Sequence, residues 1–403
     1  MLGLERIFSS LAIRDFRRFW ICIIFMMGSI QMLGIAQGFL AYELTGSNKI
    51  LGILSASSAF PMLLFSPIGG AIADRVERRK ILQLGQAISA CMTLGMGLLV
   101  LTGTVTWYYL IGVGFIQTSL WAFIAPARQS LVPMLVPKEL LSNAMGISGA
   151  GMSLGGLVAP ALGGMIYSIL GPAGVYLTIS AIGFGALTII TSLPSIPGKP
   201  IAERKPIFGE IRAGIVYVYG NKVVRTLLFS ILSISMLSAP LFALMPALIV
   251  DAYGRESAAF GIMISIGGIG SLLGALSIAY LGIWRRGLLY LTCGLVCAIT
   301  MLAISASPWF YLSVAAMMFM GLGSGTEWSL KQAIGMGNTA DAYRGRVMSI
   351  FMLAYGLTPL STLPAGVIAD IIGTQTTVGI FGGLLLIIAV CLLATQKQFR
   401  QLQ

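Results

Sequence analysis

The sequence predicts an all-α membrane protein with twelve transmembrane helices in two six-helix halves. Three observations predict this class: the composition, the lengths of the apolar runs and the distribution of positive charge. Of the 403 residues, 57% are hydrophobic and only 9% are charged, and the mean hydropathy is +0.93. A soluble domain carries roughly 25% charged residues. This composition therefore excludes an ordinary soluble protein.

The apolar runs set the number of spans, because one transmembrane helix needs about 20 apolar residues. Twelve runs qualify: 19–43, 50–73, 81–102, 106–127, 140–169, 172–194, 223–250, 258–282, 287–306, 308–330, 345–371 and 374–395. The polar stretch 195–222 is too short for a separate catalytic domain. We interpret it as a cytoplasmic linker, with a short amphipathic helix over 208–219. It separates a first half, residues 1–194, from a second half, residues 223–403.

Positive charge sets the expected topology. The net charge of +12 could suggest a nucleic-acid partner, but the Lys and Arg residues cluster on alternate loops. Only Lys49 and Arg255 depart from a pattern in which both termini are cytoplasmic. This pattern follows the positive-inside rule. We therefore expect this basic chain to have the lipid bilayer, and no nucleic acid, as its partner. We expect it to lie in a bacterial inner membrane with both termini in the cytoplasm.

Several kinds of chemistry have no residues to support them. The chain has no histidine, and its five cysteines all fall within predicted spans. Their odd number and spacing give neither a disulfide framework nor a zinc site. Cys293 and Cys297 share a helix face, which we interpret as packing. No phosphate-binding loop occurs. We expect no enzyme activity, no bound cofactor and no metal.

Polar side chains within the first and fourth spans are candidates for the wall of a substrate cavity. Gln31 and Gln37 lie in the first span, and Gln117 and Trp121 lie four residues apart in the fourth. An amide in lipid is costly, so these glutamines should face the interior of the bundle. We expect a central cavity lined by spans one, four, seven and ten. The alternatives are interhelical hydrogen bonds for the glutamines and an interfacial position for the tryptophan.

A short charged stretch follows the second span and is a candidate conformational latch. Its residues of interest are Gly69, Gly70, Asp74, Arg75, Arg78 and Arg79. The glycines allow close helix approach. One acid among several bases at a span end can form a charge-dependent contact. The alternative is a solvated loop that only sets the topology.

Two further sets of residues stand out within the spans. The fifth span contains Gly155, Pro160, Gly163 and Gly164, which predict a bent and closely packed helix. In the tenth span, Glu327 precedes Lys331 by four residues, a spacing that favours a helical ion pair. A transport role for that pair is the alternative.

Asp251 and Asp370 fall near the outer ends of their spans. We expect both carboxylates to be solvated.

The two halves share an internal repeat. Arg128-Gln129 and Lys331-Gln332 are separated by 203 positions, and Gly163 matches Gly366 at the same offset. The second half has no acid at the position of Asp74, which makes the latch chemistry asymmetric.

These motifs together resemble the major facilitator superfamily. The stretch 69–80 resembles its loop 2–3 signature, and 155–164 resembles its antiporter signature, with Ala159 in place of one glycine. Further matching pieces are 42–47, 126–146 and 344–347. The resemblance is nearest to the bacterial drug and siderophore exporters. It implies two halves related by a pseudo-two-fold axis along the membrane normal, a substrate site between them, and a latch that holds the outward-open state.

The resemblance implies a secondary exporter of small amphipathic molecules that works by alternating access as a monomer, with protons as the coupling ion. Relatives often carry an acid in the middle of the first span, where this chain has 28–31, and an arginine within the fourth span, where it has only Arg128 near the inner end. An uncoupled or differently coupled facilitator is therefore an alternative. A membrane receptor of the same fold without transport activity is another.

Overall fold

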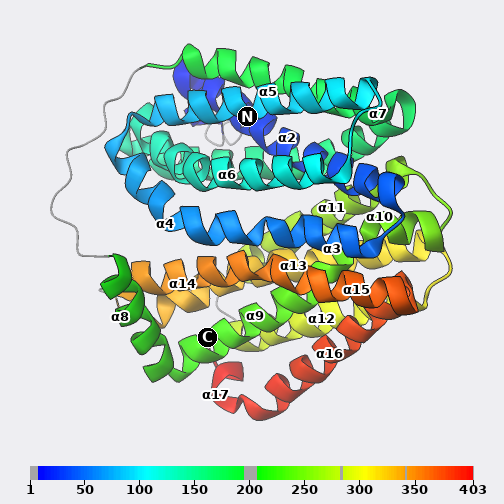
Figure 1. Ribbon diagram of the computed structural model, residues 1–403. Helices are drawn as coiled ribbons and strands as arrows, with labels where there is room; N and C mark the ends of the chain where they lie inside the picture. The colour runs from blue at the N-terminus through cyan, green and yellow to red at the C-terminus, as the bar shows by residue number, and fades with distance from the viewer. Residues whose placement is uncertain (1–7, 195–206, 282–284, 341–342, 403) are drawn as a thin grey trace. The chain divides into compact units, whose positions relative to one another are not determined.

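The computed structural model describes residues 8–194, 207–281, 285–340 and 343–402 (Figure 1). The side chains of 67, 70–71, 73–75, 207–212 and 279–281 also lie outside this description. Every regular element of the described chain is a helix. The first half contains η1 (Ser9–Ala12), α2 (Arg14–Thr45), α3 (Asn48–Ser57), α4 (Ala59–Arg75), α5 (Arg78–Leu101), α6 (Trp107–Leu135), η2 (Lys138–Leu140) and α7 (Leu141–Thr191).

The remaining elements begin within the predicted linker. They are α8 (Ile207–Gly220), α9 (Lys222–Ala243), α10 (Met245–Ala247), η3 (Leu248–Ala252), α11 (Ser257–Leu281), α12 (Arg286–Ala306), α13 (Phe310–Gly337), α14 (Arg344–Leu357), η5 (Thr358–Ser361), α15 (Thr362–Ile372), α16 (Thr374–Thr395) and α17 (Lys397–Arg400). Helix α8 falls on the stretch where an amphipathic helix was predicted.

The helix lengths confirm the predicted membrane class. Within the described residues, ten stretches are long and apolar enough to cross a bilayer. One of them contains two crossings, because Gly171 leaves helical geometry (φ 69°, ψ −178°) and divides α7. Helix α13 is not among these ten, but its 28 residues, about 42 Å at 1.5 Å per residue, are long enough for a further crossing.

Two of the predicted spans are interrupted. The second span consists of α3 and α4, and the eleventh consists of α14 and α15 with η5 between them. Pro359 in η5 lacks a backbone N–H, which removes a hydrogen bond at that break. In addition, α6 extends to Leu135, so Arg128 lies within a helix instead of in the predicted loop.

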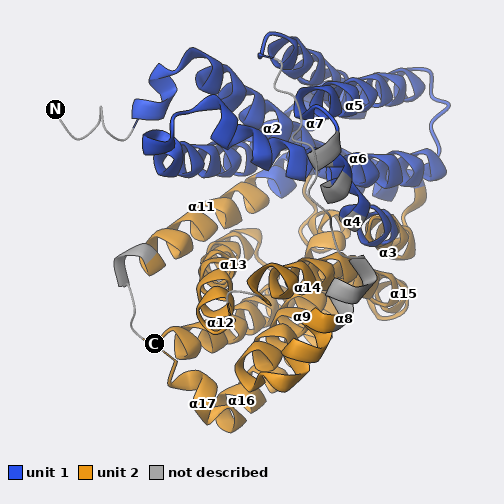
Figure 2. Ribbon diagram, turned by 90° about the vertical axis from the view of Figure 1, so that its left-hand side faces the viewer, with its two compact units in different colours: residues 1–44, 60–203, 257–261 blue, residues 45–59, 204–256, 262–403 orange. Residues whose placement is uncertain are grey.

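The chain forms two compact units, and the helices of each pack among themselves (Figure 2). Unit 1 comprises residues 1–44, 60–203 and 257–261, and within it α5 packs along both α6 and α7. Large apolar side chains of α2, including Phe16, Phe19 and Ile23, are fully buried in its core. By contrast, Ile169 is 74% exposed, as expected for a side chain that faces lipid.

Unit 2 comprises residues 45–59, 204–256 and 262–403. Within it α12 packs against α13 and α16, and α3 packs along α15 (Figure 1). Two glycines permit that last contact. A Cβ on Gly52 would stand 2.5 Å from the Thr362 carbonyl oxygen, and one on Gly366 would meet the Asn48 carbonyl oxygen. The backbones of α3 and α15 therefore touch, as small residues allow in membrane proteins.

Candidate functional site

Unit 1 contains a cavity of about 160 Å³ between α2, α5 and α6. Its wall carries apolar, amide and hydroxyl groups and one large ring: Met26, Ser29, Ile30, Gln86, Ser89, Gln117, Thr118, Trp121 and Ile124. Two of the predicted cavity residues, Gln117 and Trp121, are thus on one wall. Helix α5 also lines the cavity, which the sequence did not indicate. A space of this size holds roughly one benzene-sized group.

Polar atoms on this wall have unused hydrogen-bonding capacity. The Nε2 atom of Gln117 donates to Ser89 Oγ at 2.9 Å, while its Oε1 atom is buried without a partner. The Oγ atom of Ser29 is likewise buried and unpartnered. An unsatisfied buried polar group costs about 1–3 kcal/mol. Both residues border the cavity, while these two atoms are themselves buried in its wall.

The other two predicted cavity residues lie elsewhere on α2. Gln37 is buried, and its Nε2 atom donates to the Leu110 carbonyl oxygen at 3.4 Å, so it links α2 to α6. Gln31 is half-buried and lies next to Gly156 of α7. Neither side chain borders this cavity.

Unit 2 contains a buried polar cluster around Glu327 and Lys331 of α13. The two side chains are 5% and 2% exposed, respectively. Glu327 accepts a hydrogen bond at each carboxylate oxygen, from Tyr290 at 3.2 Å and from Tyr355 at 3.3 Å. The Nζ atom of Lys331 contacts the Tyr355 hydroxyl at 2.5 Å. The structure therefore connects the predicted pair through a tyrosine hydroxyl.

Aromatic rings complete the surroundings of Lys331. Its Nζ atom lies 3.7 Å from the ring centroid of Trp328 and 3.9 Å from that of Tyr355. Such cation–π contacts help to hold a cation away from water. The sequence contained no signal for this arrangement, because Tyr290 and Tyr355 come from α12 and α14.

Part of the candidate latch lies within the described structure. A Cβ on Gly69 would meet the Ala122 carbonyl oxygen, so this glycine lets α4 touch α6. Arg78 is buried, and its Nε atom donates to Ser130 Oγ at 2.8 Å. The side chains of Gly70, Asp74 and Arg75 lie outside the described residues.

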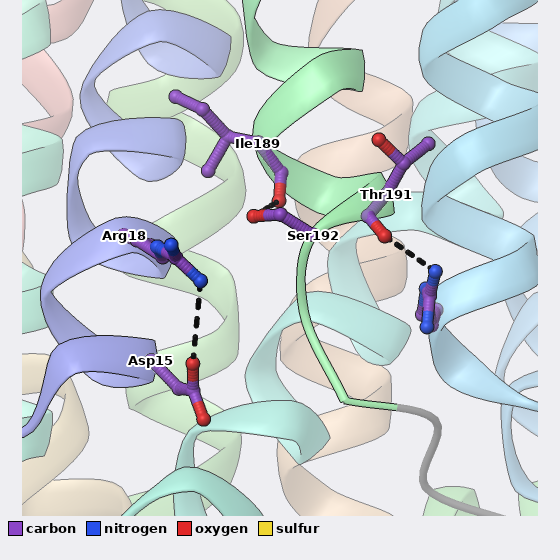
Figure 3. A network of polar contacts seen from close by, with 6 residues as sticks. Asp15, Arg18, Ile189, Thr191 and Ser192 are labelled. Atoms are coloured by element: carbon purple, nitrogen blue, oxygen red, sulfur yellow. Dashed lines mark hydrogen bonds and ion pairs between the residues drawn. The ribbon is translucent and has the colours of Figure 1, made fainter.

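Polar contacts gather where α2 and α5 begin and where α7 ends (Figure 3). Arg79 donates to the Thr191 carbonyl oxygen at the end of α7. On α2, Arg18 and Asp15 form an ion pair at 3.8 Å. Arg78 and Arg79, the two arginines of the candidate latch whose side chains the structure describes, thus both donate hydrogen bonds to groups of unit 1.

Glycines of the fifth span allow two close helix contacts. A Cβ on Gly155 would stand 2.7 Å from Met27 Cβ, and one on Gly163 would stand 3.1 Å from Met32 Cγ, both on α2. A Cβ on Gly164 would stand 2.5 Å from the carbonyl oxygen of Ser257, the first residue of α11. Pro160 lies within the same contact, because a Cβ on Gly261 would meet its carbonyl oxygen.

Asp370, at the end of α15, is exposed, as expected, and it also accepts hydrogen bonds. Its carboxylate accepts hydrogen bonds from Ser47 Oγ at 2.9 Å, from the Asn48 backbone N–H at 2.7 Å and from the Lys49 backbone N–H at 3.1 Å. It thus caps α3, where the free N–H groups favour an anion. Sequence alone missed this role, because 322 positions separate Asp370 from Asn48.

Comparison with known proteins gives consistent similarities. A profile of the transmembrane secretion effector family, a group within the major facilitator superfamily, matches residues 6–402. Macrolide efflux protein A of Streptococcus pyogenes is 25% identical, with 89% of this chain and 90% of that protein covered. Multidrug efflux pump Tap of Mycobacterium tuberculosis is 26% identical, with 85% of this chain and 84% of that protein covered.

Solved structures show the same fold. A mutant form of the nucleoside transporter NupG matches with a TM-score of 0.81 at 14% identity, covering 94% of this chain and 99% of that one. An inward-facing bacterial homologue of the lysosomal transporter Spinster matches with a TM-score of 0.68 at 14% identity, covering 96% of each chain. At this identity the likeness extends to the fold alone.

Proposed function

We propose that this protein, which belongs to the transmembrane secretion effector family of the major facilitator superfamily, exports small amphipathic molecules by proton-coupled alternating access. It is an efflux transporter, and its relatives are named for macrolide and multidrug efflux.

The cavity of unit 1 is the observation that carries the substrate class. It combines the Trp121 ring and apolar walls with the unpaired Gln117 Oε1 and Ser29 Oγ atoms. An amphipathic molecule can bury a ring there, and its donor can reach the Gln117 amide oxygen when that side chain turns toward the cavity. About 160 Å³ is too small for a whole macrolide, so we propose that this cavity is a subsite for one apolar group of a larger guest.

The contacts of α3 and of the start of α11 support a switch between two states. Helix α3 packs in unit 2 while α4 of the same span packs in unit 1, and residues 257–261 of α11 pack in unit 1 while the rest packs in unit 2. With both termini in the cytoplasm, as the positive-inside rule favours, the Asp370 cap lies at the outer face. We propose that it closes the outer side and breaks when that side opens.

The loop around Asp74 provides the opposing latch at the cytoplasmic face. Its described arginines, Arg78 and Arg79, hold the start of α5 against α6 and the end of α7. We propose that this anchored platform presents Asp74 to a partner that is in reach only in the outward-open state.

Flux in proteoliposomes tests the proposal. Radiolabelled erythromycin and ethidium serve as probes, with and without a pH gradient, and empty liposomes serve as the control. Gradient-driven movement of either probe supports a proton-coupled exporter. Flux that ignores the gradient indicates a facilitator. Movement of neither probe, from a protein with an intact thermal transition, overturns the transport of this substrate class.

Direction is tested in cells. A bacterial host that lacks its own pumps should accumulate less ethidium when it expresses this chain than when it carries an empty vector. Higher accumulation in the expressing cells would indicate uptake and overturn the proposal of export.

A further inference from the structure

Glu327 is the one acid that is buried within the part of the chain described by the structure. The described acids outside this cluster are half-buried or exposed. A charged side chain inside a membrane span is costly and is therefore associated with ion or proton pathways. The burial of Glu327 therefore calls for an explanation, either functional or structural, and its surroundings favour one of the two.

The surroundings of Glu327 are polar and titratable on several sides. The groups that face the cluster come from α9, α12, α13 and α14: Ser235, Tyr290, Cys293, Cys297, Lys331 and Tyr355. Lys331 supplies the one positive charge of this set. With Glu327 ionised the cluster is neutral, and with Glu327 protonated it carries one net positive charge. A single proton therefore changes the charge of a buried site by one unit.

The geometry suits a carboxyl group that changes its protonation state. Each carboxylate oxygen of Glu327 has one tyrosine hydroxyl partner, and the Tyr355 hydroxyl also contacts Lys331. A hydroxyl can donate to one partner and accept from another, so it can reorient when the carboxyl gains a proton. An ion pair built only for stability would gain more from direct contact between the two charges.

Tyr355 also lies close to a break in its helix. Helix α14 ends at Leu357, and the 3₁₀ turn η5, which contains Pro359, follows immediately. Interrupted helices adjoin the binding and coupling sites of many secondary transporters, because a break lets one segment move without the other. A change in the Glu327 charge can thus act on α14 through the Tyr355 hydroxyl.

We propose that Glu327 is the proton-binding site that couples export to the proton gradient, with Tyr355 and Lys331 as its positioning residues. This inference rests on the proposed function. The proton binds a Glu327 carboxylate oxygen from water on the outer side and leaves to water on the cytoplasmic side, in exchange for one substrate molecule moved outward. Tyr355 holds the carboxylate and transmits its charge state to Lys331.

Infrared spectroscopy tests proton binding without a substrate. Difference spectra of the purified protein in lipid, taken across a pH titration, report the carbonyl stretch of buried protonated carboxyls. We expect one such band in the wild-type protein. The control variant Glu139→Gln, which loses an exposed carboxylate instead of a buried one, should show the same band. Glu327→Gln should lack the band. A titrating band that remains in Glu327→Gln, or a wild-type protein without one, overturns the proposal.

Transport tests whether this proton drives export. Ethidium is a permanent cation, so a pH gradient alone does not redistribute it across a liposome membrane. One proton exchanged per ethidium allows about tenfold accumulation per unit of pH gradient. We expect this ratio for the wild-type protein and for Glu139→Gln, and a ratio near one for Glu327→Gln.

The outcomes separate this inference from the proposed function. Equal accumulation by Glu327→Gln and the wild-type protein overturns the role of Glu327 and leaves export intact. A wild-type protein that moves neither ethidium nor erythromycin overturns the proposed function, and the infrared titration still decides whether Glu327 binds a proton. If Glu327→Gln does not fold, Tyr355→Phe replaces it, because this change keeps the carboxyl. Its infrared midpoint should differ from the wild type, and an identical midpoint would overturn the positioning role.

Discussion

Arg128 in unit 1 and Lys331 in unit 2 occupy matching positions of the internal repeat, yet their surroundings differ. Each cation contacts the side chain 24 residues further along, Met152 for Arg128 and Tyr355 for Lys331. Each also lies over a tryptophan ring, at 5.7 Å and 3.7 Å respectively. The repeat therefore preserves where a buried cation lies and which position it contacts.

The difference between the two sites is in the chemistry of the partners. Arg128 contacts a thioether sulfur, and its Nε atom is buried without a partner. Lys331 contacts a hydroxyl that also donates to Glu327. The position that matches Glu327 in the first half, 203 residues earlier, is Ile124, which lines the cavity of unit 1. One half thus uses this position for an apolar wall, and the other half uses it for an acid.

Removal of the two cations should affect stability to very different extents. Lys331→Met leaves Glu327 buried without its positive charge, which should cost about 3–5 kcal/mol. Arg128→Met removes a buried cation that contacts no acid among the described residues, so its effect should be close to zero or stabilising. The measurement is the thermal midpoint in detergent micelles, read by tryptophan fluorescence. Equal losses in both variants would contradict the distinction.

The double variant Lys331→Met with Glu327→Gln sharpens the same comparison. Neutralising the acid should recover most of the stability lost in Lys331→Met, because no uncompensated charge remains. Additive losses would show that packing around Lys331, and not charge, determines its effect.

The matching glycines Gly163 and Gly366 should differ in their tolerance of a methyl group. In Gly366→Ala the Cβ would meet the backbone oxygen of Asn48, which must shift, whereas in Gly163→Ala it would meet the flexible Met32 side chain. We expect Gly366→Ala to cost about 1–3 kcal/mol and Gly163→Ala less. Thermal midpoints of the two variants provide the comparison.

A side chain much larger than a methyl group should not be tolerated at Gly163. Gly163→Leu should separate α7 from α2 and abolish transport, at a packing cost of roughly 1–3 kcal/mol. Flux of ethidium in proteoliposomes measures the loss. Normal flux through Gly163→Leu would contradict the close contact between these helices.

The two tryptophans should differ in their importance for ligand binding. Trp121 lines the cavity of unit 1, whereas Trp328 lies over Lys331. Trp121→Ala should weaken the binding of a probe that stacks on the ring by on the order of 1 kcal/mol, about a fivefold rise in Kd, while Trp328→Ala should leave Kd unchanged. Equilibrium binding of radiolabelled erythromycin and of ethidium to both variants provides the measurement. Unchanged affinity of Trp121→Ala for a probe that the wild type binds would rule out this subsite.

The smallest effects concern the two acids Asp370 and Asp74. Asp370→Asn weakens the cap on α3 and should cost about 0.3–1 kcal/mol, the usual value for a charge at a helix N-terminus. It should shift the population toward the outward-open state. Asp74→Asn should shift it the other way and slow transport. Labelling of single cysteines on each face detects both shifts.

Lys49→Ala is the matched control for the outer acid. Lys49 contacts Asp370 through its backbone N–H, which this substitution keeps. Its labelling pattern should equal that of the wild-type protein. A shift in Lys49→Ala as large as that in Asp370→Asn would mean that general disturbance of the loop, and not the cap, is responsible.

Most of the fold could be predicted from the sequence because a bilayer imposes simple rules. A span must be apolar over about 20 residues, and positive charge gathers on the cytoplasmic side. These rules are local, so they identified the membrane class without any knowledge of packing. Helix periodicity likewise placed Gln117 and Trp121 on one helix face, since residues four apart share a face.

Tertiary structure decided which of the polar residues meet. Asp370 and Asn48 lie 322 positions apart, and Tyr290, Glu327 and Tyr355 come from three helices. No periodicity within one span can encode such encounters, because they depend on how helices rotate and approach. For the same reason, the sequence could not show that Gln37 links two helices whereas Gln117 lines a cavity. Local hydropathy thus determined which segments enter the membrane, and close packing at glycines determined which side chains face one another.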